Sequence, residues 1–351
     1  MDDAQALMVE VLRANALQWR EDGSPFYGEL SERIADDVEA GGPTWDVLSA
    51  HAVRPKTELP AIRMLDAVHR LVLSGAAPGL MPHYPSTGGD GDAAAAWPSF
   101  LETVADHPDA LRRALDQPPQ TNDVGRCPAV IGGLLTVAAE AGLPVRLLEL
   151  GSSAGLLLRC DHYRYEASND AWGDPASPVR FVDPWLEGVP PLDAPLRIVE
   201  RRGVDRHPLD PSREEDRLGL LSFVWPDELP RFDLLRSALE VAARFPSAVE
   251  QGSIPEWLRA NLTPLPTGAV TVVLNSYAWM YLDDESRAST EQTLDDAAAS
   301  ASSDAPLAHL AFEALDGDYN NTQLRLTLWP GGEERLLGLG GAHAEPVRWL
   351  A

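Results

Sequence analysis

Apolar residues recur every three or four positions through the first part of the chain. The stretches 4–20, 59–74 and 97–116 show this period, which is typical of amphipathic helices. Glycine- and proline-rich segments separate them. No stretch before residue 145 alternates apolar and polar residues as a half-buried strand does. The pattern therefore predicts a helical N-terminal domain over residues 1–127.

After residue 127 the pattern changes to strands that alternate with helices. Short apolar runs predict strands at 145–150, 196–204, 269–275, 307–313, 323–329 and 334–339. Helical patterns lie between them at 129–141, 213–221, 227–244, 254–261 and 284–299. Alternation of this kind predicts a mostly parallel sheet with helices on both faces.

The remaining signals complete this expected fold. Gly331-Gly332 suits a hairpin turn and predicts an antiparallel C-terminal edge. The polar, aromatic and proline-rich segment 163–195 is interpreted as an insertion, with a short strand at 179–182. We therefore expect a Rossmann-like α/β domain of the methyltransferase type over residues 128–351.

The most informative motif lies where the first strand ends. An apolar run reaches Glu149, and Gly151, Ser153 and Gly155 follow before the chain becomes apolar again. This order is typical of a strand, a tight glycine turn and a helix. Such a turn lets a ligand approach the backbone and the helix N-terminus. Ser153 replaces the middle glycine of the dinucleotide fingerprint. The single leading acid favours S-adenosylmethionine, whose ammonium group pairs with a carboxylate. A tight turn that binds no ligand is the alternative.

An acidic residue at the end of the next strand would bind the ribose hydroxyls. Asp205 has that position, although it lies further from Gly155 than the usual spacing of about 20 residues. The insertion explains the longer spacing. Asp183 competes for this role, and either residue also reads as a solvated turn aspartate.

Candidate substrate contacts follow the strand at 269–275. Asn275 would bind and orient the acceptor, Tyr281 is a candidate catalytic residue, and Trp279 would wall the substrate pocket. The structural alternatives are an asparagine that caps the next turn and aromatic residues that belong to the core.

Further residues are candidates from other parts of the chain. Asp161 or His162 is a candidate general base, with a hydrogen-bonded scaffold for the insertion as the alternative. His343 is a candidate catalytic residue near the C-terminus, with a structural role as the alternative. Asn122 and Arg126 are candidate substrate ligands, since an arginine binds a carboxylate through two hydrogen bonds. An interdomain salt bridge is the alternative for Arg126. No metal site is expected, because no Cys/His cluster has ligand spacing.

The charge of the chain restricts its partners. The formal net charge of −26 argues against nucleic acid and against an anionic membrane surface. The N-terminus lacks a signal-peptide pattern and no uninterrupted apolar run reaches transmembrane length. A cytoplasmic protein that binds a small molecule is expected.

Several segments together resemble an uncharacterised bacterial domain-of-unknown-function family that is common in high-GC bacteria. They are Ala67-Val-His-Arg-Leu-Val-Leu73, His83-Tyr-Pro-Ser86, Gln120-Thr-Asn-Asp-Val-Gly-Arg126, Leu147–Gly155, Asp161–Tyr165, Trp172-Gly-Asp-Pro175, Arg201–Asp210, Val224-Trp-Pro-Asp227 and Leu326-Thr-Leu-Trp-Pro-Gly331. The family looks like class I methyltransferases in its glycine turn. Leu157 stands where relatives tend to have asparagine, and Asn275 where many have histidine, which indicates a repurposed member.

The sequence therefore predicts an S-adenosylmethionine-dependent, methyltransferase-like enzyme of natural-product biosynthesis. Glu149, Gly151, Ser153, Gly155 and Asp205 would bind the cofactor. The alternative is a protein that keeps the fold without the cofactor and supports cyclisation or elimination of a biosynthetic intermediate, alone or as one subunit of a complex. A non-catalytic scaffold is the third reading. A protein partner or a second copy of the chain is compatible with each.

Overall fold

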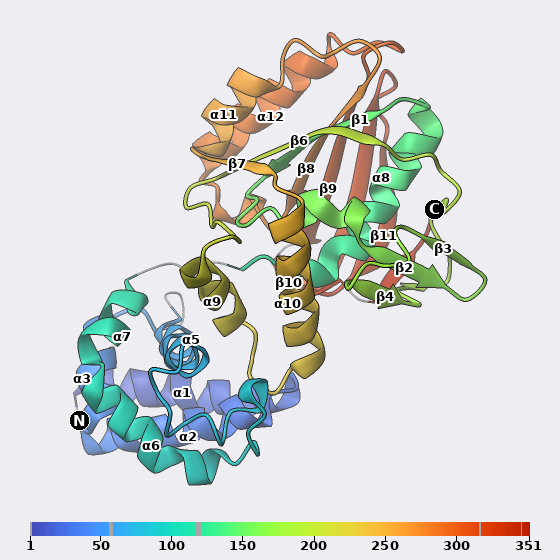
Figure 1. Cartoon of the computed structure of the whole chain (residues 1–351). Coiled ribbons are helices and arrows are strands. Elements are labelled where there is room, and N and C mark those ends of the chain that lie inside the picture. The colour runs from blue at the N-terminus through green and yellow to red at the C-terminus, as the bar shows by residue number, and fades with distance from the viewer. Residues whose placement is uncertain (1, 56–58, 117–120, 316, 345) are drawn as a thin grey trace. The chain divides into compact units, whose positions relative to one another are not determined.

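The computed structural model of the chain describes residues 2–55, 59–116, 121–315, 317–344 and 346–351 (Figure 1). Gln120, the first residue of one family-like segment, lies outside them. The chain divides into two compact units. The helical unit comprises Met1–Thr121 and Arg213–Arg236, and the sheet unit comprises Asn122–Ser212 and Ser237–Ala351. The helical unit thus takes in a segment from the middle of the chain, and its N-terminal part ends at Thr121, whereas the sequence analysis placed the boundary after residue 127.

The described residues of the helical unit form mainly α-helices. They are α1 (Asp3–Glu21), α2 (Pro25–Ala40), α3 (Pro43–Leu48), α5 (Pro60–Leu73), α6 (Ala93–Asp106), α7 (Pro108–Leu115) and α9 (Glu214–Ser222). Side chains cap several N-termini: Ser24 accepts a hydrogen bond from the Tyr27 amide, and Asp92 from the Ala95 amide. The helix predicted at 97–116 is two helices, because Pro108 starts a new helix after His107.

The sheet unit is a mixed α/β structure with a large, mostly parallel sheet. Its strands are β1 (Val145–Leu150), β5 (Trp185–Leu186), β6 (Ile198–Asp205), β7 (Ala248–Gln251), β8 (Val270–Ser276), β9 (Leu307–Leu315), β10 (Asp318–Trp329), β11 (Glu334–Gly340) and β12 (Val347–Trp349). They lie in the order β5-β12-β11-β10-β9-β8-β1-β6-β7. The five strands from β9 to β7 are parallel, whereas β10, β11 and β12 are antiparallel to their neighbours along the chain. The predicted antiparallel hairpin is confirmed.

Helices cover both faces of this sheet (Figure 1). On one face, α11 (Ile254–Asn261) and α12 (Asp284–Ala298) pack on Leu148 and Val273. On the other face, α8 (Cys127–Ala141) brings Gly133 against Leu310 of β9, so closely that a Cβ on this glycine would lie 2.5 Å from it. The long helix α10 (Leu229–Arg244) begins in the helical unit and ends in the sheet unit. Strands β1 and β8 are buried on both faces, which explains their continuous apolar runs.

The segment after the glycine turn differs from the prediction. The α-helix expected to run to about residue 162 is a short 3₁₀-helix, η4 (Leu157–His162). The insertion follows as a small sheet of β2 (Arg164–Ala167), β3 (Asp170–Trp172) and β4 (Arg180–Val182), so the short strand expected there is present. The ring of Tyr165 stacks on that of Phe181 with centroids 5.1 Å apart. Aromatic stacking therefore takes the place of a larger core in the insertion.

One apolar segment among the described residues is long enough to cross a membrane by length and composition. It is Val124–Ala141, with a mean hydropathy of 1.3, and 78% of it is buried inside the protein. A core helix of a globular unit passes the same test, and α8 packs on β9 and β10 in that way.

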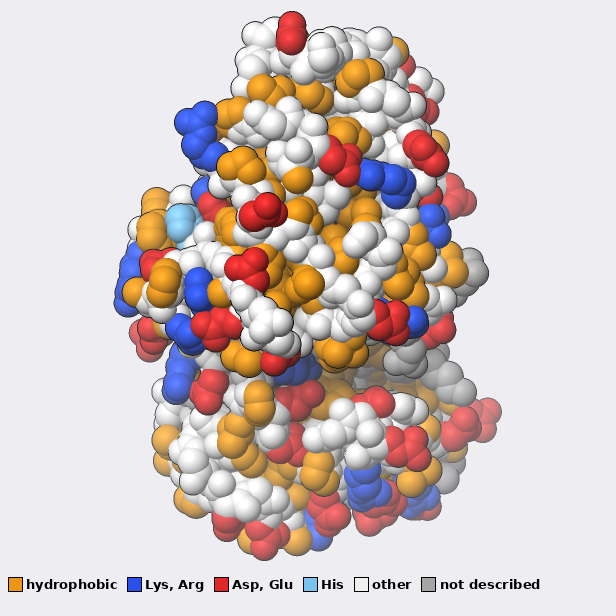
Figure 2. Space-filling model, turned by 90° about the vertical axis from the view of Figure 1, so that its right-hand side faces the viewer, with side chains coloured by type: hydrophobic (Ala, Val, Ile, Leu, Met, Phe, Trp, Pro, Cys, Tyr) orange, Lys and Arg blue, Asp and Glu red, His pale blue; other side chains and the backbone are white. Residues whose placement is uncertain are grey.

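Acidic and basic side chains are interspersed on the face shown in Figure 2.

Candidate functional site at the carboxyl edge of the sheet

Four parallel strands end beside one another at the same edge of the sheet. Leu150 of β1 pairs with Asn275 of β8, and Val204, the residue before Asp205, pairs with Leu150 on the other side. Asn275 in turn pairs with Ala311 of β9, two residues before Glu313. In open α/β sheets, ligands bind outside these carboxyl ends where the strand order reverses, which here is between β1 and β8.

The glycine turn after β1 has a left-handed backbone at three positions. Gly151, Ser153 and Gly155 have φ values of 75°, 51° and 67°. Serine rarely adopts this conformation, so Ser153 is strained unless its surroundings hold it. The Ser153 amide donates to Oδ2 of Asp205 at 2.8 Å, and Oδ1 of Asp205 accepts from the His207 amide at 2.9 Å. The structure therefore brings Ser153 and Asp205 together.

Other polar groups of the turn are also bound by the chain itself. The Leu156 amide donates to Oδ1 of Asn122 at 2.8 Å. Arg159, with 2% of its surface exposed, donates from Nη1 to the carbonyl oxygens of Ala154 and Gly155 at 3.0 and 2.6 Å. These hydrogen bonds from other parts of the chain hold the backbone of the turn in place.

Glu149 is buried at the end of β1 without a complete set of partners. It is 2% exposed, and its Oε2 atom has no hydrogen-bond partner among the described residues. Burial raises the pKa of Glu149 to about 8, against the opposing effects of Ser152, Arg159 and Arg126. The carboxyl group is therefore mostly protonated at neutral pH. A cation placed beside it would reverse that preference.

Asn275 joins two residues of β9 that the sequence analysis did not single out. Its Nδ2 donates to Oε1 of Glu313 at 2.7 Å, and its Oδ1 lies 2.7 Å from Nε2 of His309. Oε1 of Glu313 also accepts from the amides of Ala278 and Trp279, at 2.9 and 3.3 Å. Both ends of the Asn275 amide are thus used inside the protein, so this residue positions Glu313.

The two β9 residues of this network have shifted pKa values. Burial raises the pKa of Glu313 above its ordinary range, although the hydrogen bond from Asn275 opposes the shift. Burial lowers the pKa of His309 to about 4, so its ring is neutral at physiological pH. A neutral ring carries one N–H, and the contact with Oδ1 of Asn275 places it on Nε2.

Arg126 lies close to both carboxyl groups. Its guanidinium sits 4.1 Å from the centre of the Tyr277 ring, and its Nε donates to the Ala342 carbonyl at 2.9 Å. Its positive charge lowers the pKa of Glu149 and of Glu313, although burial outweighs it in both. Within the described part of the chain, Arg126 forms no salt bridge, and the interdomain alternative stays untested.

The other predicted residues lie in different surroundings. Asp161, within η4, accepts two hydrogen bonds from Arg201, at 2.7 and 2.9 Å, and this ion pair accounts for its position. His343 pairs through Nδ1 with Asp123. Tyr281 is 65% exposed beyond β8. Trp279 places its ring centroid 5.8 Å from that of His309 and thus borders the network.

Glu313 could have been found from the sequence. The predicted strand at 307–313 ends at this residue, and the carboxyl ends of parallel strands meet at one edge. Only the pairing of β9 with β8 shows that this end lies beside Asn275. No group of three metal-binding side chains occurs among the described residues.

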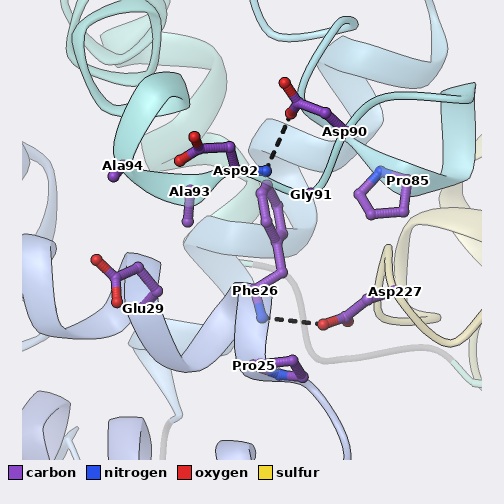
Figure 3. A pocket seen from close by; sticks show the side chains of 10 residues that line it. All are labelled: Pro25, Phe26, Glu29, Pro85, Asp90, Gly91, Asp92, Ala93, Ala94 and Asp227. Carbon is purple, nitrogen blue, oxygen red and sulfur yellow. Dashed lines mark hydrogen bonds between the residues drawn. The ribbon is translucent and has the colours of Figure 1, made fainter.

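A pocket also occurs in the helical unit, with a volume of about 620 Å³ (Figure 3). It is lined by Pro25, Phe26, Glu29, Pro85, Asp90, Gly91, Asp92, Ala93, Ala94 and Asp227. Its acidic groups have structural roles: Asp227 accepts from the Phe26 amide, as Figure 3 shows, and Asp92 caps α6. The carboxyl edge is the stronger candidate site, because it combines a buried carboxyl group that has an unbonded oxygen with Arg126, which has no acidic partner among the described residues.

Fold and site together define an α/β protein with a candidate small-molecule site at the carboxyl edge of its sheet. The model of the family described as an uncharacterized protein conserved in bacteria, DUF2332, matches residues 9–349, and the chain therefore belongs to that family. No curated protein matches the chain, and no solved structure does.

Proposed function

We propose that the chain is a methyltransferase-like enzyme that uses S-adenosylmethionine to methylate a small molecule. The parallel strands, numbered along the chain, have the order 3-2-1-4-5, which is that of doubly wound nucleotide-binding sheets. An antiparallel extension follows at β10–β12. This topology supports a Rossmann-like origin of the methyltransferase type.

The observation that carries the proposal is the cluster of Arg126, Glu149 and Glu313 around the ends of β1, β8 and β9. S-adenosylmethionine has an α-amino acid end, with one carboxylate and one ammonium group. Arg126 would bind the carboxylate, and the unsatisfied oxygen of Glu149 would accept from the ammonium. Asp205 would accept from the ribose hydroxyls with its remaining lone pairs.

The chain's own contribution to the reaction would be positioning. S-adenosylmethionine supplies an electrophilic methyl group when it is bound. Arg126 and Glu149 would fix one end of it, and the strained turn at Ser153 would set the distance to Asp205. Holding the acceptor in line with the methyl group accounts for much of the rate of such a transfer.

Calorimetry of the full chain with S-adenosylmethionine tests this proposal. We expect binding, and we expect the heat to change with the ionisation enthalpy of the buffer at pH 7, because Glu149 must release its proton to the buffer when an ammonium group binds beside it. We expect Arg126→Gln to weaken binding about tenfold or more, since a hydrogen bond to a charged group contributes about 1.5–3 kcal/mol.

Arg335→Gln is the matched control. Arg335 also binds a carboxylate through two hydrogen bonds, but on the surface, with Glu140. This variant should bind like the wild type. A folded wild-type chain that binds neither S-adenosylmethionine nor S-adenosylhomocysteine would sink the proposal.

A second candidate is favoured by the internal bonding of the turn. Asn122, Asp205 and Arg159 already satisfy polar groups that a cofactor would otherwise contact. The chain would then position one biosynthetic intermediate for cyclisation or elimination, alone or with a partner subunit. Native mass spectrometry of the purified chain separates the two: a retained small molecule other than S-adenosylmethionine supports this candidate.

The proposed setting is cytoplasmic natural-product biosynthesis, without nucleic acid or membrane partners. The net charge of −26 supports the exclusion of polyanions. Light scattering of the purified chain reports whether a second copy belongs to the working form.

A further inference from the structure

We infer that Glu313 binds the amino group of the methyl acceptor, so that the acceptor is a small amine. This inference rests on the proposed function for the methyl transfer, whereas the amine binding itself can be measured without the cofactor. The geometry that points to it is a carboxylate with one oxygen held by the protein at the carboxyl edge of the sheet.

The three hydrogen bonds that described residues donate to Glu313 all go to the same oxygen. Oε1 accepts from Asn275 Nδ2 at 2.7 Å, from the Ala278 amide at 2.9 Å and from the Trp279 amide at 3.3 Å. A carboxylate oxygen has two lone pairs, so three donors saturate Oε1. No described residue donates a hydrogen bond to Oε2, which is therefore left to a ligand.

His309 orients the Asn275 amide that binds Glu313. His309 and Glu313 lie four residues apart on β9, so their side chains share one face of the sheet. Asn275 lies between them on β8, and the His309 Nε2–H bond to its Oδ1 turns the amide NH₂ toward Glu313. His309 is therefore a positioning residue, as is Asn275.

The Glu313 carboxylate and a neighbouring ring suit an organic cation. Two other charges act on the network: Arg126, from the segment before α8, acts on Glu313 and has the same sign as an ammonium ligand, and Glu334, from β11, acts on His309. The Trp279 ring borders the network at 5.8 Å from the His309 ring, and an aromatic face attracts a cation. A hydroxyl acceptor would gain less, because a hydrogen bond between a carboxylate and a charged donor is the stronger kind.

The transfer to such an acceptor balances. Glu313 Oε2 takes a proton from the ammonium, which frees the nitrogen lone pair. That lone pair forms the N–CH₃ bond while the S–CH₃ bond of S-adenosylmethionine breaks and its electron pair stays on sulfur. The products are a methylated ammonium, a neutral thioether and the protonated carboxyl group.

Ligand-observed NMR on the full chain tests the inference, with benzylamine and benzyl alcohol as probes. We expect the wild type to bind the amine and not the alcohol, and Glu313→Gln to weaken amine binding about tenfold or more. Glu140→Gln, at a surface ion pair, is the control and should bind like the wild type. His309→Ala should move the pH midpoint of amine binding, and His309→Gln, which keeps an N–H donor, should restore it.

Two results would overturn the inference. One is a folded wild type that binds the alcohol as well as the amine, or binds neither. The other is a Glu313→Gln chain with an unchanged melting curve and wild-type amine binding. Amine binding by a chain that does not bind S-adenosylmethionine would reject the proposed methyl transfer and leave Glu313 as an amine-binding residue.

Discussion

Glu149 combines deep burial with an unsatisfied carboxylate oxygen. Arg159, nearby and equally buried, spends its donors on carbonyl oxygens of the turn and on the Phe245 carbonyl. Burying an isolated charge costs free energy. Buried carboxyl groups with a shifted pKa, such as that of Glu149, therefore cluster at sites of ligand binding or reaction. The carboxyl pKa of about 8 expresses that cost.

The first prediction concerns the pH dependence of stability. The pKa of Glu149 is about 8 in the folded chain, against 4.5 ordinarily. Between these values the folded state holds a proton that the unfolded state has lost, so the free energy of unfolding falls as the pH rises. The free energy of unfolding falls by about 1.4 kcal/mol for each unit by which folding raises the pKa. Glu149→Gln should lessen this fall in urea titrations across this range.

The wild type and Glu149→Gln are compared by the slope of the free energy of unfolding against pH. A loss of stability from the glutamine that is the same at every pH therefore does not affect the comparison. Glu140→Gln, at an exposed ion pair with Arg335, should leave the slope as in the wild type. Parallel stability curves for the wild type and Glu149→Gln would contradict the raised pKa.

At the scale of elements, the turn between β1 and η4 shows what packing adds to a sequence motif. The pattern Glu149-x-Gly151-x-Ser153-x-Gly155 predicts a tight turn after a strand, and that turn is present. The expected helix is missing, since the chain after the turn forms the 3₁₀-helix η4. Periodicity cannot distinguish the two over six residues, because both bury apolar groups at short spacing.

A substitution in this turn tests its packing. A Cβ on Gly155 would lie 2.9 Å from Cγ2 of Val249 in β7, and the residue has a φ of 67°. Gly155→Ala therefore meets both a steric clash and backbone strain. Gly142 has a φ of 62° with open space around it, so Gly142→Ala is a control with strain alone.

We expect Gly142→Ala to cost about 1–2 kcal/mol, the typical strain of a left-handed alanine. Gly155→Ala should cost more by about 1–3 kcal/mol, as overpacking does. Thermal and urea unfolding measure both. Equal losses in the two variants would show that β7 yields without cost.

For the whole molecule, the division into two units does not follow the chain. Arg213–Arg236 belongs to the helical unit although it lies between segments of the sheet unit. Its Asp227 accepts hydrogen bonds from the Ser24 hydroxyl and the Phe26 amide, about two hundred residues earlier. Its Trp225 ring lies 6.2 Å from the Trp19 ring. The start of α2 is thus completed by a distant segment.

A third stability prediction follows from that contact. Asp227→Ala should lower the free energy of unfolding by about 1–2 kcal/mol, because it removes an acceptor from the N-terminus of α2. Asp233→Ala is the control, since Asp233 forms an exposed ion pair with Arg236 in α10. Urea unfolding measures both, and equal stabilities would contradict a structural role for Asp227.

The sequence by itself determined the strands and the helices with clear periods. Strand β1 and helix α11 have the expected bounds. The burial of a parallel strand and of one face of an amphipathic helix shows directly in the order of apolar and polar residues. The sequence also placed Glu149, Asn275 and Asp205 at the ends of their strands or within one residue of them. Tertiary structure alone decided that Glu313 and His309 meet Asn275, that Asp161 is held by Arg201, and that residues 213–236 join the helical unit. These are contacts between segments far apart in the chain, and no local period encodes them.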